Sequence, residues 1–388
     1  MEALLISDQM KKIAIVNRSF WPSSPAIGEG LLLLSESLVG KGTPIVITQV
    51  KKGFKESLER ENRGQGVIFS TLASFTSSSS HLALRVLELI AFSLFVLFSL
   101  CKYRPDIVYV ATNPPVFTPM IVRWYCKFFS KKYIYHVQDI HPEATQIVTG
   151  KSNFITRFLF RIDVKNMQQA SVLLTLTEQM KQYIEKRIEV TPPVFLINNP
   201  SVQSAEVSQN IEREKGFVYC GNAGRLQRIP LLIEAIKSYL NQGGNLPFIF
   251  AGGGVYKSAI EQLAGDYHQV TYLGVLPADK AAQLLNKYTF GLMPIEDEVT
   301  DYAFPSKSSS YVFSGCQVIA ICGENTSVAE WVKQYNVGIL VKPTVDSIVK
   351  SFWELEQNTI ECMEVNDLKS HMTPAYFSCE LEKVIFNA

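Results

Sequence analysis

The stretch FVYCGNAGRLQRIPLLIEAI, residues 217–236, contains the pattern that decides the fold. Its first part is a short apolar run rich in aromatic and β-branched residues, which is typical of a buried β-strand. A glycine-containing turn follows, and after Pro230 leucine and isoleucine recur at helical spacing. Strand, turn and helix in this order form one half of a βαβ unit, so the stretch predicts an α/β architecture with parallel strands.

Apolar runs of the same kind recur along the chain in two series. In the first half they occupy 11–17, 43–49, 66–71, 106–112, 131–137, 172–177 and 194–198. In the second half they occupy 217–222, 247–252, 270–274, 290–295, 317–322 and 337–341. The runs are apolar on both faces and alternate with stretches of helical periodicity, which suits parallel sheets covered by helices on each side. We therefore expect two doubly wound, Rossmann-like α/β domains.

The polar segment 198–216 contains none of these apolar runs in its interior and is the predicted linker. It divides the chain into an N-terminal domain, 1–199, and a C-terminal domain, 200–371, a division that suits a chain of 388 residues. In parallel α/β sheets, ligands bind outside the carboxyl ends of the strands, and small-molecule sites concentrate between domains. We expect the two sets of strand ends to face one cleft, and the residues after each strand to hold the chemistry.

Composition excludes several classes of protein. With 47% hydrophobic and 19% charged residues, the chain is neither disordered nor collagen-like. Its 37 basic and 36 acidic residues leave a net charge of +1, which argues against a nucleic-acid partner. The seven cysteines form no Cys-x-x-Cys pair, and the first ten residues do not resemble a signal peptide, so a reduced, cytoplasmic location is expected.

The stretch LALRVLELIAFSLFVLFSLC, residues 82–101, raises the question of membrane contact. Its uninterrupted apolar part, 89–101, is shorter than the roughly 20 residues that a spanning helix needs. We interpret the stretch as a helix of a globular domain, buried or half-buried. Peripheral contact of this helix with the inner face of the cytoplasmic membrane stays open as an alternative, whereas a membrane span is not favoured.

Two motifs follow strands in the first half. Gly28 and Gly30 precede a helical pattern, where bare backbone and helix-terminal N–H groups could meet an anion, or could simply form a turn. Asp139, His141 and Glu143 cluster after the run 131–137 and are the candidate catalytic residues. They could supply a general base or bind hydroxyl groups, although Asp139 could instead cap a helix. The His, Cys and carboxylate spacings match no zinc motif, so metal catalysis is not expected.

The second half places cations at two predicted helix starts. Arg225 and Arg228 lie in the glycine-containing turn before the helical stretch 230–240, and Lys307 follows Ser306 at a second helix start. Guanidinium or ammonium groups beside helix N-terminal N–H groups suit a bound diphosphate. Surface arginines are the alternative interpretation.

Two further turns of the second half leave alternatives open. Gly252-Gly253-Gly254 ends a strand and either lets backbone approach a ligand or makes a tight turn. The acidic triplet Glu296-Asp297-Glu298 could bind a metal ion, but we interpret it as a solvated loop because cations nearby already supply positive charge.

Taken together and in order, these motifs resemble glycosyltransferase family 4, most closely the bacterial enzymes of O-antigen and capsule assembly. The resemblance extends from about Lys11 to the C-terminus. The motifs are Gly28-x-Gly30, Gln138-Asp139-Ile140-His141-Pro142-Glu143, Gly221-Asn222-Ala223-Gly224-Arg225-Leu226-Gln227, Ala251-Gly252-x-Gly254, Leu273-Gly274-Val275-Leu276-Pro277 and Pro305-Ser306-Lys307 with Tyr311 and Gly315.

The resemblance implies the GT-B fold and a division of labour between its domains. The first domain would bind the acceptor, the second would bind a nucleotide-diphosphate-sugar donor, and segment 372–388 would fold back onto the first domain. Transfer would retain the anomeric configuration, without cofactor or essential metal. The implied contacts to the diphosphate are Gly28, Gly30, Arg225, Arg228, Ser306 and Lys307. The implied contacts to the donor nucleoside and sugar are Asn222, Gly224, Gly252, Gly254 and Ser310.

The chain departs from many members of this family at several positions. Ser310 and Tyr302 stand where two glutamates are common, which weakens the implied ribose contact. Gln227 and Asn222 replace a lysine and an arginine of the diphosphate loop, and Gln138 replaces a histidine. Arg225 and Lys307 would have to neutralise more of the diphosphate charge, and Asp139 or His141 would substitute for the missing histidine.

The expected function is transfer of a sugar from a nucleotide-diphosphate-sugar to a lipid-linked saccharide, in synthesis of a cell-surface polysaccharide such as O-antigen, lipopolysaccharide or capsule. A nucleotide-sugar 2-epimerase of the same architecture is one alternative. A non-catalytic nucleotide-binding partner in polysaccharide assembly is another, motivated by Ser310 and Tyr302.

Overall fold

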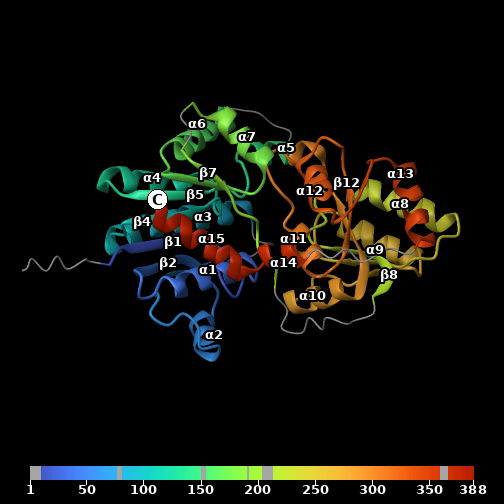
Figure 1. The fold of residues 1–388 in the computed structure, drawn as a ribbon, viewed down its shortest axis with the longest axis horizontal. Coiled ribbons are helices and arrows are strands. Elements are labelled where there is room, and N and C mark those ends of the chain that lie inside the picture. The colour runs from blue at the N-terminus through green and yellow to red at the C-terminus, as the bar shows by residue number, and fades with distance from the viewer. Residues whose placement is uncertain (1–9, 77–80, 150–153, 190–191, 203–212, 359–365) are drawn as a thin grey trace, which may run out of the picture.

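The chain forms two α/β domains that lie side by side (Figure 1). The computed structural model describes residues 10–76, 81–149, 154–189, 192–202, 213–358 and 366–388. The first domain contains a parallel 7-stranded sheet in the order β3-β2-β1-β4-β5-β6-β7. Its strands are β1 (Lys12–Val16), β2 (Thr43–Val50), β3 (Ile68–Ala73), β4 (Ile107–Ala111), β5 (Lys132–His136), β6 (Val172–Thr175) and β7 (Val194–Leu196).

Helices cover both faces of this first sheet. One face carries α1 (Ile27–Ser37), α2 (Phe54–Arg60) and α15 (Pro374–Asn387), and the other carries α3 (Leu82–Tyr103), α4 (Phe117–Phe129), α6 (Phe154–Gln168) and α7 (Glu178–Arg187). A short helix, α5 (Glu143–Thr149), follows β5. Because every residue of β4 is buried between these layers, the strand is apolar throughout rather than alternating.

The second domain contains a parallel 6-stranded sheet in the order β10-β9-β8-β11-β12-β13. Its strands are β8 (Glu214–Cys220), β9 (Phe248–Ala251), β10 (Val270–Tyr272), β11 (Tyr288–Pro294), β12 (Gln317–Ile321) and β13 (Gly338–Val341). One face is covered by α8 (Ile229–Asn241), α9 (Lys257–Asp266) and α13 (Val345–Gln357). The other is covered by α10 (Ala278–Lys287), α11 (Lys307–Phe313), α12 (Ser327–Tyr335) and α14 (Asn366–His371), and the 3-10 helix η1 (Asp297–Val299) follows β11. Every strand expected from the apolar runs is present, so the prediction of two doubly wound parallel domains is confirmed.

Threonine residues fix where several helices begin. The hydroxyls of Thr177, Thr326, Thr344 and Thr373 each accept a hydrogen bond from an N–H group in the first turn of α7, α12, α13 and α15. Each such cap satisfies a backbone donor that the helix cannot pair internally and contributes about 1 kcal/mol. Local chemistry therefore sets the ends of elements whose existence comes from apolar periodicity.

The C-terminal helix returns to the first domain, where α15 lies against α1 (Figure 1). The contact is tight because a Cβ added at Gly30 would lie 2.5 Å from Cδ1 of Phe377. Of the predicted linker 198–216, residues 203–212 lie outside the described residues, as do the first nine residues of the chain.

The apolar stretch 82–101 forms the half-buried helix α3. Among the described residues it is the one helix long and apolar enough to cross a membrane, with a mean hydropathy of 2.2 over its most apolar window, 33% of which is buried. Its inner side packs on the sheet through Phe92, Val96 and Leu100. The helix extends beyond the apolar part 89–101 at its N-terminal end, where it includes the charged residues Arg85 and Glu88.

Candidate functional site

A pocket of about 460 Å³ lies between the two domains. Its walls come from five segments: residues 24–27 before α1, residues 199–202, the end of β8 with its turn, one side of α10, and the start of α11. The β8 end is a topological switch point, because β9 and β11 flank β8 and the chain leaves these neighbours on opposite faces. Open α/β sheets bind ligands at such points, and the volume suits a small molecule.

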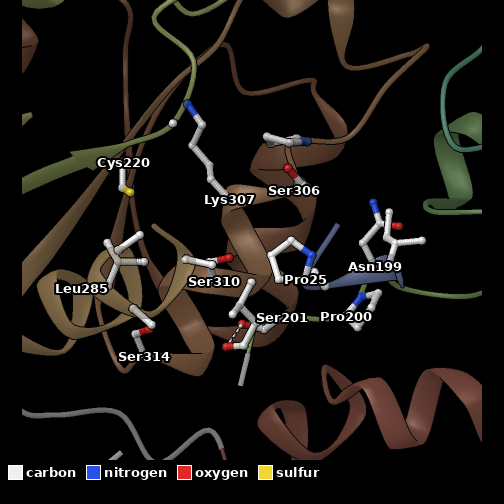
Figure 2. A pocket seen from close by; sticks show the side chains of 18 of the residues that line it. Pro25, Asn199, Pro200, Ser201, Cys220, Leu285, Ser306, Lys307, Ser310 and Ser314 are labelled. Atoms are coloured by element: carbon white, nitrogen blue, oxygen red, sulfur yellow. Dashed lines mark hydrogen bonds between the residues drawn. The ribbon is translucent and has the colours of Figure 1, made fainter. Parts of the chain in front are cut away.

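Lys307, the first residue of α11, is the cation inside this pocket (Figure 2). Its side chain reaches toward the end of β8, where Nζ lies 3.0 Å from the hydroxyl oxygen of Tyr219 and 4.2 Å from the centroid of that ring. The Tyr219 hydroxyl in turn donates to the carbonyl oxygen of Asn222 at 2.7 Å. Burial lowers the pKa of Lys307 to about 7. An anion bound beside this amine would favour the protonated form, so Lys307 is suited to hold a phosphate.

Ser306 and Ser310 line the same pocket from α11, together with Cys220 from β8 (Figure 2). Ser306 precedes the first turn of α11, so that turn begins at the pocket wall, where the N–H group of Ser308 is bonded to the carbonyl oxygen of Pro305 at 3.0 Å. Burial raises the pKa of the Cys220 thiol, which keeps it uncharged near neutral pH. The amine of Lys307 and the hydroxyl groups of Ser306 and Ser310 therefore lie on the α11 side of the pocket.

The glycine-containing turn after β8 is shaped by contacts between backbones. A Cβ at Gly252 would collide with the carbonyl oxygen of Gly221, and one at Gly254 with that of Ala223. Both glycines also have positive φ, which disfavours any larger residue. The sequence left open whether these glycines admit a ligand or form a tight turn. In the structure, the groups that approach them belong to the turn after β8.

Two other residues of the turn have different surroundings. Gly224 donates its N–H to Oε1 of Gln227 at 3.0 Å, which closes the turn on itself. Asn222 is exposed and lines the pocket, as does Gln227. Asn222 therefore stays a candidate donor contact, whereas the N–H group of Gly224 is already paired.

The two arginines of this turn lie outside the pocket lining. Arg225 is exposed to solvent. Arg228 donates to the carbonyl oxygen of Ile295 at 2.7 Å and forms ion pairs with Glu296 at 3.2 Å and Asp297 at 3.0 Å. Two residues of the acidic triplet that we interpreted as a solvated loop, Glu296 and Asp297, thus bind Arg228. Because two carboxylates already neutralise its charge, Arg228 is a poor diphosphate ligand in this arrangement.

The N-terminus of α1 provides the first-domain wall of the pocket. Residues 24–27 line it, while Gly28 and Gly30 serve packing behind them. A Cβ at Gly28 would lie 2.5 Å from the backbone nitrogen of Trp21, and Gly30 gives room to Phe377. The N–H group of Gly30 is also bonded to the carbonyl oxygen of Ala26 at 3.1 Å. Gly30 thus has a packing role in this structure, and its contact with a phosphate stays a prediction.

Asp139 lies where the two domains meet. Its backbone pairs with Ala303, and the N–H of Ile140 donates to the carbonyl oxygen of Tyr302 at 2.7 Å. The preceding Gln138 donates to Oδ1 of Asn199, a pocket residue, at 3.3 Å. Asp139 keeps an exposed side while protein crowds its other sides, and this burial raises its pKa to about 6. A carboxylate of this kind could accept a proton from a substrate near neutral pH.

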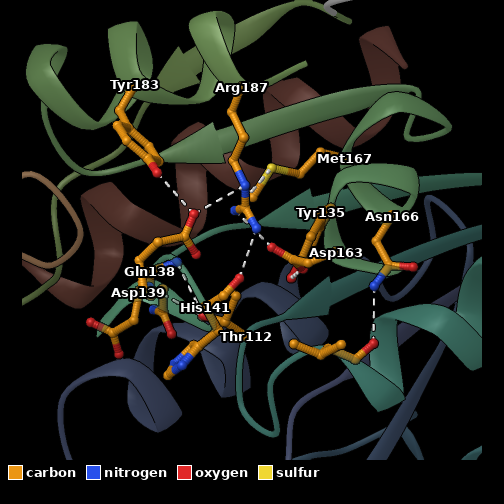
Figure 3. A network of polar contacts seen from close by, with 12 residues as sticks. Thr112, Tyr135, Gln138, Asp139, His141, Asp163, Asn166, Met167, Tyr183 and Arg187 are labelled. Carbon is orange, nitrogen blue, oxygen red and sulfur yellow. Dashed lines mark hydrogen bonds and ion pairs between the residues drawn. The ribbon is translucent and has the colours of Figure 1, made fainter. Parts of the chain in front are cut away.

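His141 and Glu143 belong instead to a buried network around Arg187 (Figure 3). The guanidinium donates to the carbonyl oxygen of His141 at 2.9 Å and forms ion pairs with Asp163 at 3.0 Å and Glu143 at 3.3 Å. Glu143 also accepts from the Tyr183 hydroxyl at 2.9 Å. Burial, with a contribution from Arg187, lowers the pKa of His141 to about 4, so its imidazole is neutral at pH 7.

This network separates the three candidate catalytic residues. In Figure 3 the Asp139 carboxylate points away from the Arg187 guanidinium, on which the network is centred. The carboxylate of Glu143 is engaged by Arg187 and Tyr183, which makes it unsuited to be the general base. Of the three, Asp139 is the residue that the geometry leaves available at the domain boundary.

Two residues of this region carry no recognisable sequence signal. Arg187 ends a predicted helix, EQMKQYIEKR, and looks like an ordinary basic residue in the last turn. Tyr219 lies inside the run 217–222 and looks like an ordinary core aromatic. Arg187 pairs with Asp163, 24 residues away, and Tyr219 with Lys307, 88 residues away, so these contacts emerge only from the folded arrangement.

Most of the second domain matches the model of a known protein family. Residues 214–358 match the model of the family described as "Glycosyl transferases group 1". The second domain is therefore similar to group 1 glycosyltransferase domains. Its matched segment includes the β8 turn and Lys307, and the match supports an enzyme of the transferase class.

The chain also resembles a bacterial protein over part of its length. It is 23% identical over 252 residues to "Probable glycosyltransferase WbjE" of Pseudomonas aeruginosa. The match covers 61% of this chain and 62% of WbjE, so the chain spans about three fifths of that relative.

Solved structures share the whole two-domain fold. Anabaena Alr3699/HepE, solved with UDP, has a TM-score of 0.57 and 15% identity, covering 97% of this chain and 95% of HepE. UDP-GlcNAc 2-epimerase from Methanocaldococcus jannaschii has a TM-score of 0.57 and 13% identity, covering 97% of this chain and 100% of the epimerase. At these identities the likeness is one of fold, and the fold is GT-B.

Proposed function

We propose that this protein is a glycosyltransferase that moves a sugar from a nucleotide-diphosphate-sugar to a saccharide acceptor. The observation that carries the proposal is Lys307, whose buried amine lies in the interdomain pocket at the β8 switch point of a domain similar to group 1 glycosyltransferase domains. A diphosphate is the part of such a donor that needs a cation. UDP is the first nucleotide to test, because the related fold of HepE was solved with UDP.

The proposed chemistry stabilises the leaving group. As the glycosidic bond breaks, negative charge grows on the departing diphosphate, and preorganised donors aimed at that charge lower the barrier. Lys307 and the N–H groups at the start of α11 would supply these donors, together with the N-terminus of α1 at the opposite wall. Arg225 could join them only by turning inward, since it is exposed and outside the lining.

Retention of the anomeric configuration is part of the proposal. In a front-face reaction the departing phosphate oxygen takes the proton of the acceptor hydroxyl, so a strong protein base is not needed. Asp139 would then orient the sugar or the acceptor at the domain boundary. If the enzyme inverts instead, the same carboxylate becomes the base, because its pKa of about 6 leaves it ionised at pH 7.

The acceptor is proposed to be a lipid-linked saccharide of O-antigen, lipopolysaccharide or capsule synthesis, handled on the cytoplasmic side of the membrane. Support comes from the order of motifs that resembles family 4 and from the partial match to WbjE. Activity is proposed to need no metal, since ammonium and helix N–H groups can balance the diphosphate. Full activity in excess EDTA is expected, and a strict metal requirement would remove this part of the proposal.

The test combines a donor panel with mass spectrometry. Purified protein is incubated with UDP-, GDP- and dTDP-sugars and a lipid-diphosphate-saccharide, and an increase in acceptor mass by one sugar is expected with at least one donor. The anomeric configuration of the product, determined by NMR, decides between retention and inversion. Failure of transfer with every donor would overturn the proposal.

The same assay recognises the two other functions. Isomerisation of the donor without any acceptor would identify a 2-epimerase, which shares this fold. Saturable nucleotide binding without turnover would identify a non-catalytic partner, which the unusual Ser310 and Tyr302 would then explain.

A further inference from the structure

Three adjacent helices of the first domain expose a broad apolar surface. We call it the α3–α4–α6 face, because α4 packs against both α3 and α6 and all three cover the same side of the sheet. Its most exposed apolar side chains are Leu94 and Phe98 of α3, Trp124 and Phe128 of α4, and Phe154 and Ile155 of α6. Phe128 and Phe154 are each 81% exposed. Monomeric soluble proteins rarely leave contiguous patches of this kind uncovered.

The charges on these helices all have one sign. The exposed charged residues of α3, α4 and α6 are Arg85, Lys102, Lys127, Arg157, Arg161 and Lys165. The acidic residues of the same helices, Glu88 and Asp163, are buried. The whole chain has 37 basic and 36 acidic residues, so positive charge is concentrated at this face rather than general.

The face belongs to the folded domain and cannot become a membrane span without unfolding it. Glu88 of α3 accepts hydrogen bonds from the N–H groups of Phe75 at 2.8 Å and Thr76 at 3.0 Å, and forms an ion pair with Arg18. Burial alone would raise the pKa of Glu88, but hydrogen bonds from Thr76, Phe75 and Ser74 lower it to about 2. Extracting α3 would break these contacts together with the packing of Phe92 on the sheet.

We propose that the α3–α4–α6 face docks on the surface of a membrane that contains anionic lipids. Apolar side chains would enter the boundary between headgroups and acyl chains, while the surrounding lysines and arginines would contact the anionic headgroups. A second copy of the chain fits less well, because a two-fold pairing of this face would bring its cations against one another without an exposed acidic residue on the same helices.

The helices of this face begin on the side of the sheet that faces the cleft. α4 begins shortly after the carboxyl end of β4, and α5, which precedes α6, begins shortly after that of β5. Asp139 lies between β5 and α5. Docking would therefore hold the first domain, which is the predicted acceptor domain, on the lipid surface. The docking itself goes beyond the proposed function and does not depend on sugar transfer.

The test is co-sedimentation with vesicles. The full chain is mixed with vesicles of phosphatidylcholine alone or of phosphatidylcholine with phosphatidylglycerol. We expect binding to the anionic vesicles, weakened by salt, and loss of binding in the double variant Phe98→Glu/Phe128→Glu. Val275→Glu, which changes an equally exposed apolar residue in the second domain, is the matched control and should bind like the wild type.

Charge is tested separately with Lys127→Gln/Arg161→Gln, for which we expect about five-fold weaker binding per removed cation. Lys280→Gln in the second domain is the control. UDP binding by calorimetry and transfer to a water-soluble acceptor are measured on every variant and should not change. These readouts separate failure of docking from failure of the proposed function, because neither needs a membrane.

Three results would overturn the proposal. The wild type could stay in the supernatant with both kinds of vesicle, or the face variants could bind as tightly as Val275→Glu. Sedimentation analysis could also reveal a wild-type dimer that Phe98→Glu/Phe128→Glu dissociates without any effect on vesicle binding, which would assign the face to a second copy of the chain.

Discussion

At the scale of single residues, surroundings rather than residue type decide which cation serves the pocket. Lys307, Arg225 and Arg228 all stand at turns before helices and are equally plausible diphosphate ligands in the sequence. In the fold, Arg228 is neutralised by Glu296 and Asp297, and Arg225 is exposed outside the lining. Lys307 is left as the buried amine facing the pocket.

Replacing Lys307 tests this assignment. Lys307→Ala should lower kcat/KM about 100- to 1,000-fold, the effect of losing one preorganised donor to a developing charge. Steady-state kinetics measure it, with Lys280→Ala on the outer side of α10 as the control that should keep wild-type activity. A Lys307→Ala enzyme with full activity would remove the central residue from the proposed site.

Proton linkage gives a second measurement on the same amine. The free Lys307 has a pKa of about 7, and a bound diphosphate should raise that pKa. Binding therefore takes up a proton above about pH 7, and UDP affinity should fall as the pH rises beyond that value. Calorimetry in buffers of different ionisation enthalpy detects the uptake. Lys307→Arg, which stays charged, should abolish both effects.

Asp139 makes a different prediction about pH. Burial raises its pKa to about 6, so the carboxylate is lost as the pH falls through that value. The profile of kcat/KM should therefore have an acid limb near pH 6, and Asp139→Asn should lower activity and remove the limb. Asp279→Asn, an exposed carboxylate of α10, is the control. A limb that persists in Asp139→Asn belongs to another group.

At the scale of elements, the Arg187 side chain connects three helices, α5, α6 and α7. It lies at the end of α7, and its ion pairs reach Asp163 of α6 and Glu143 of α5. Its hydrogen bond to the carbonyl oxygen of His141 holds the segment that follows Asp139. Of the residues expected to be catalytic, Asp139 therefore lies at the domain boundary, whereas His141 and Glu143 belong to the network that holds the segment after it.

Removing this guanidinium should destabilise the first domain. Arg187→Met leaves Asp163 and Glu143 without their buried partner, which should cost about 3–5 kcal/mol in the free energy of unfolding. Urea titration followed by circular dichroism measures the loss. Adding Asp163→Asn should recover part of it, because one uncompensated charge is removed. Equal stability of wild type and Arg187→Met would show that the network is not structural.

At the scale of the whole molecule, the chain returns from the second domain to the first after α14, and α15 packs on α1. The close approach requires a glycine at position 30, since a Cβ there would lie 2.5 Å from the Phe377 ring. The chain thus connects the two domains twice, once before β8 and once before α15. The pocket therefore lies between two domains that are linked at both of these places.

Gly30→Ala tests the packing of α15. Crowding at this contact should lower the free energy of unfolding by about 1–3 kcal/mol, measured by urea titration. Gly265→Ala in α9 is the matched control, because a Cβ there meets nothing within 4 Å. Helix propensity alone should make that control slightly more stable. If both variants behave alike, the contact of Gly30 with Phe377 does not hold the helix.

Local sequence patterns were sufficient to predict the architecture. Apolar runs such as 217–222 and the helical periodicity after Pro230 are patterns among neighbours in the chain. Because parallel strands are buried on both faces, each strand can be recognised as a continuous apolar run without knowledge of its tertiary contacts. The same local chemistry pointed to the turns after the strands as the place for the site.

The surroundings of each polar residue in those turns, in contrast, depend on contacts made in the folded chain. The charge state and the role of Lys307, Arg228 and Glu143 depend on groups brought close from distant parts of the chain, which no local pattern records. The apolar residues of α3 likewise form a surface only beside α4 and α6. Electrostatic and contact energies act over a few ångströms in space, whereas sequence motifs report neighbours along the chain.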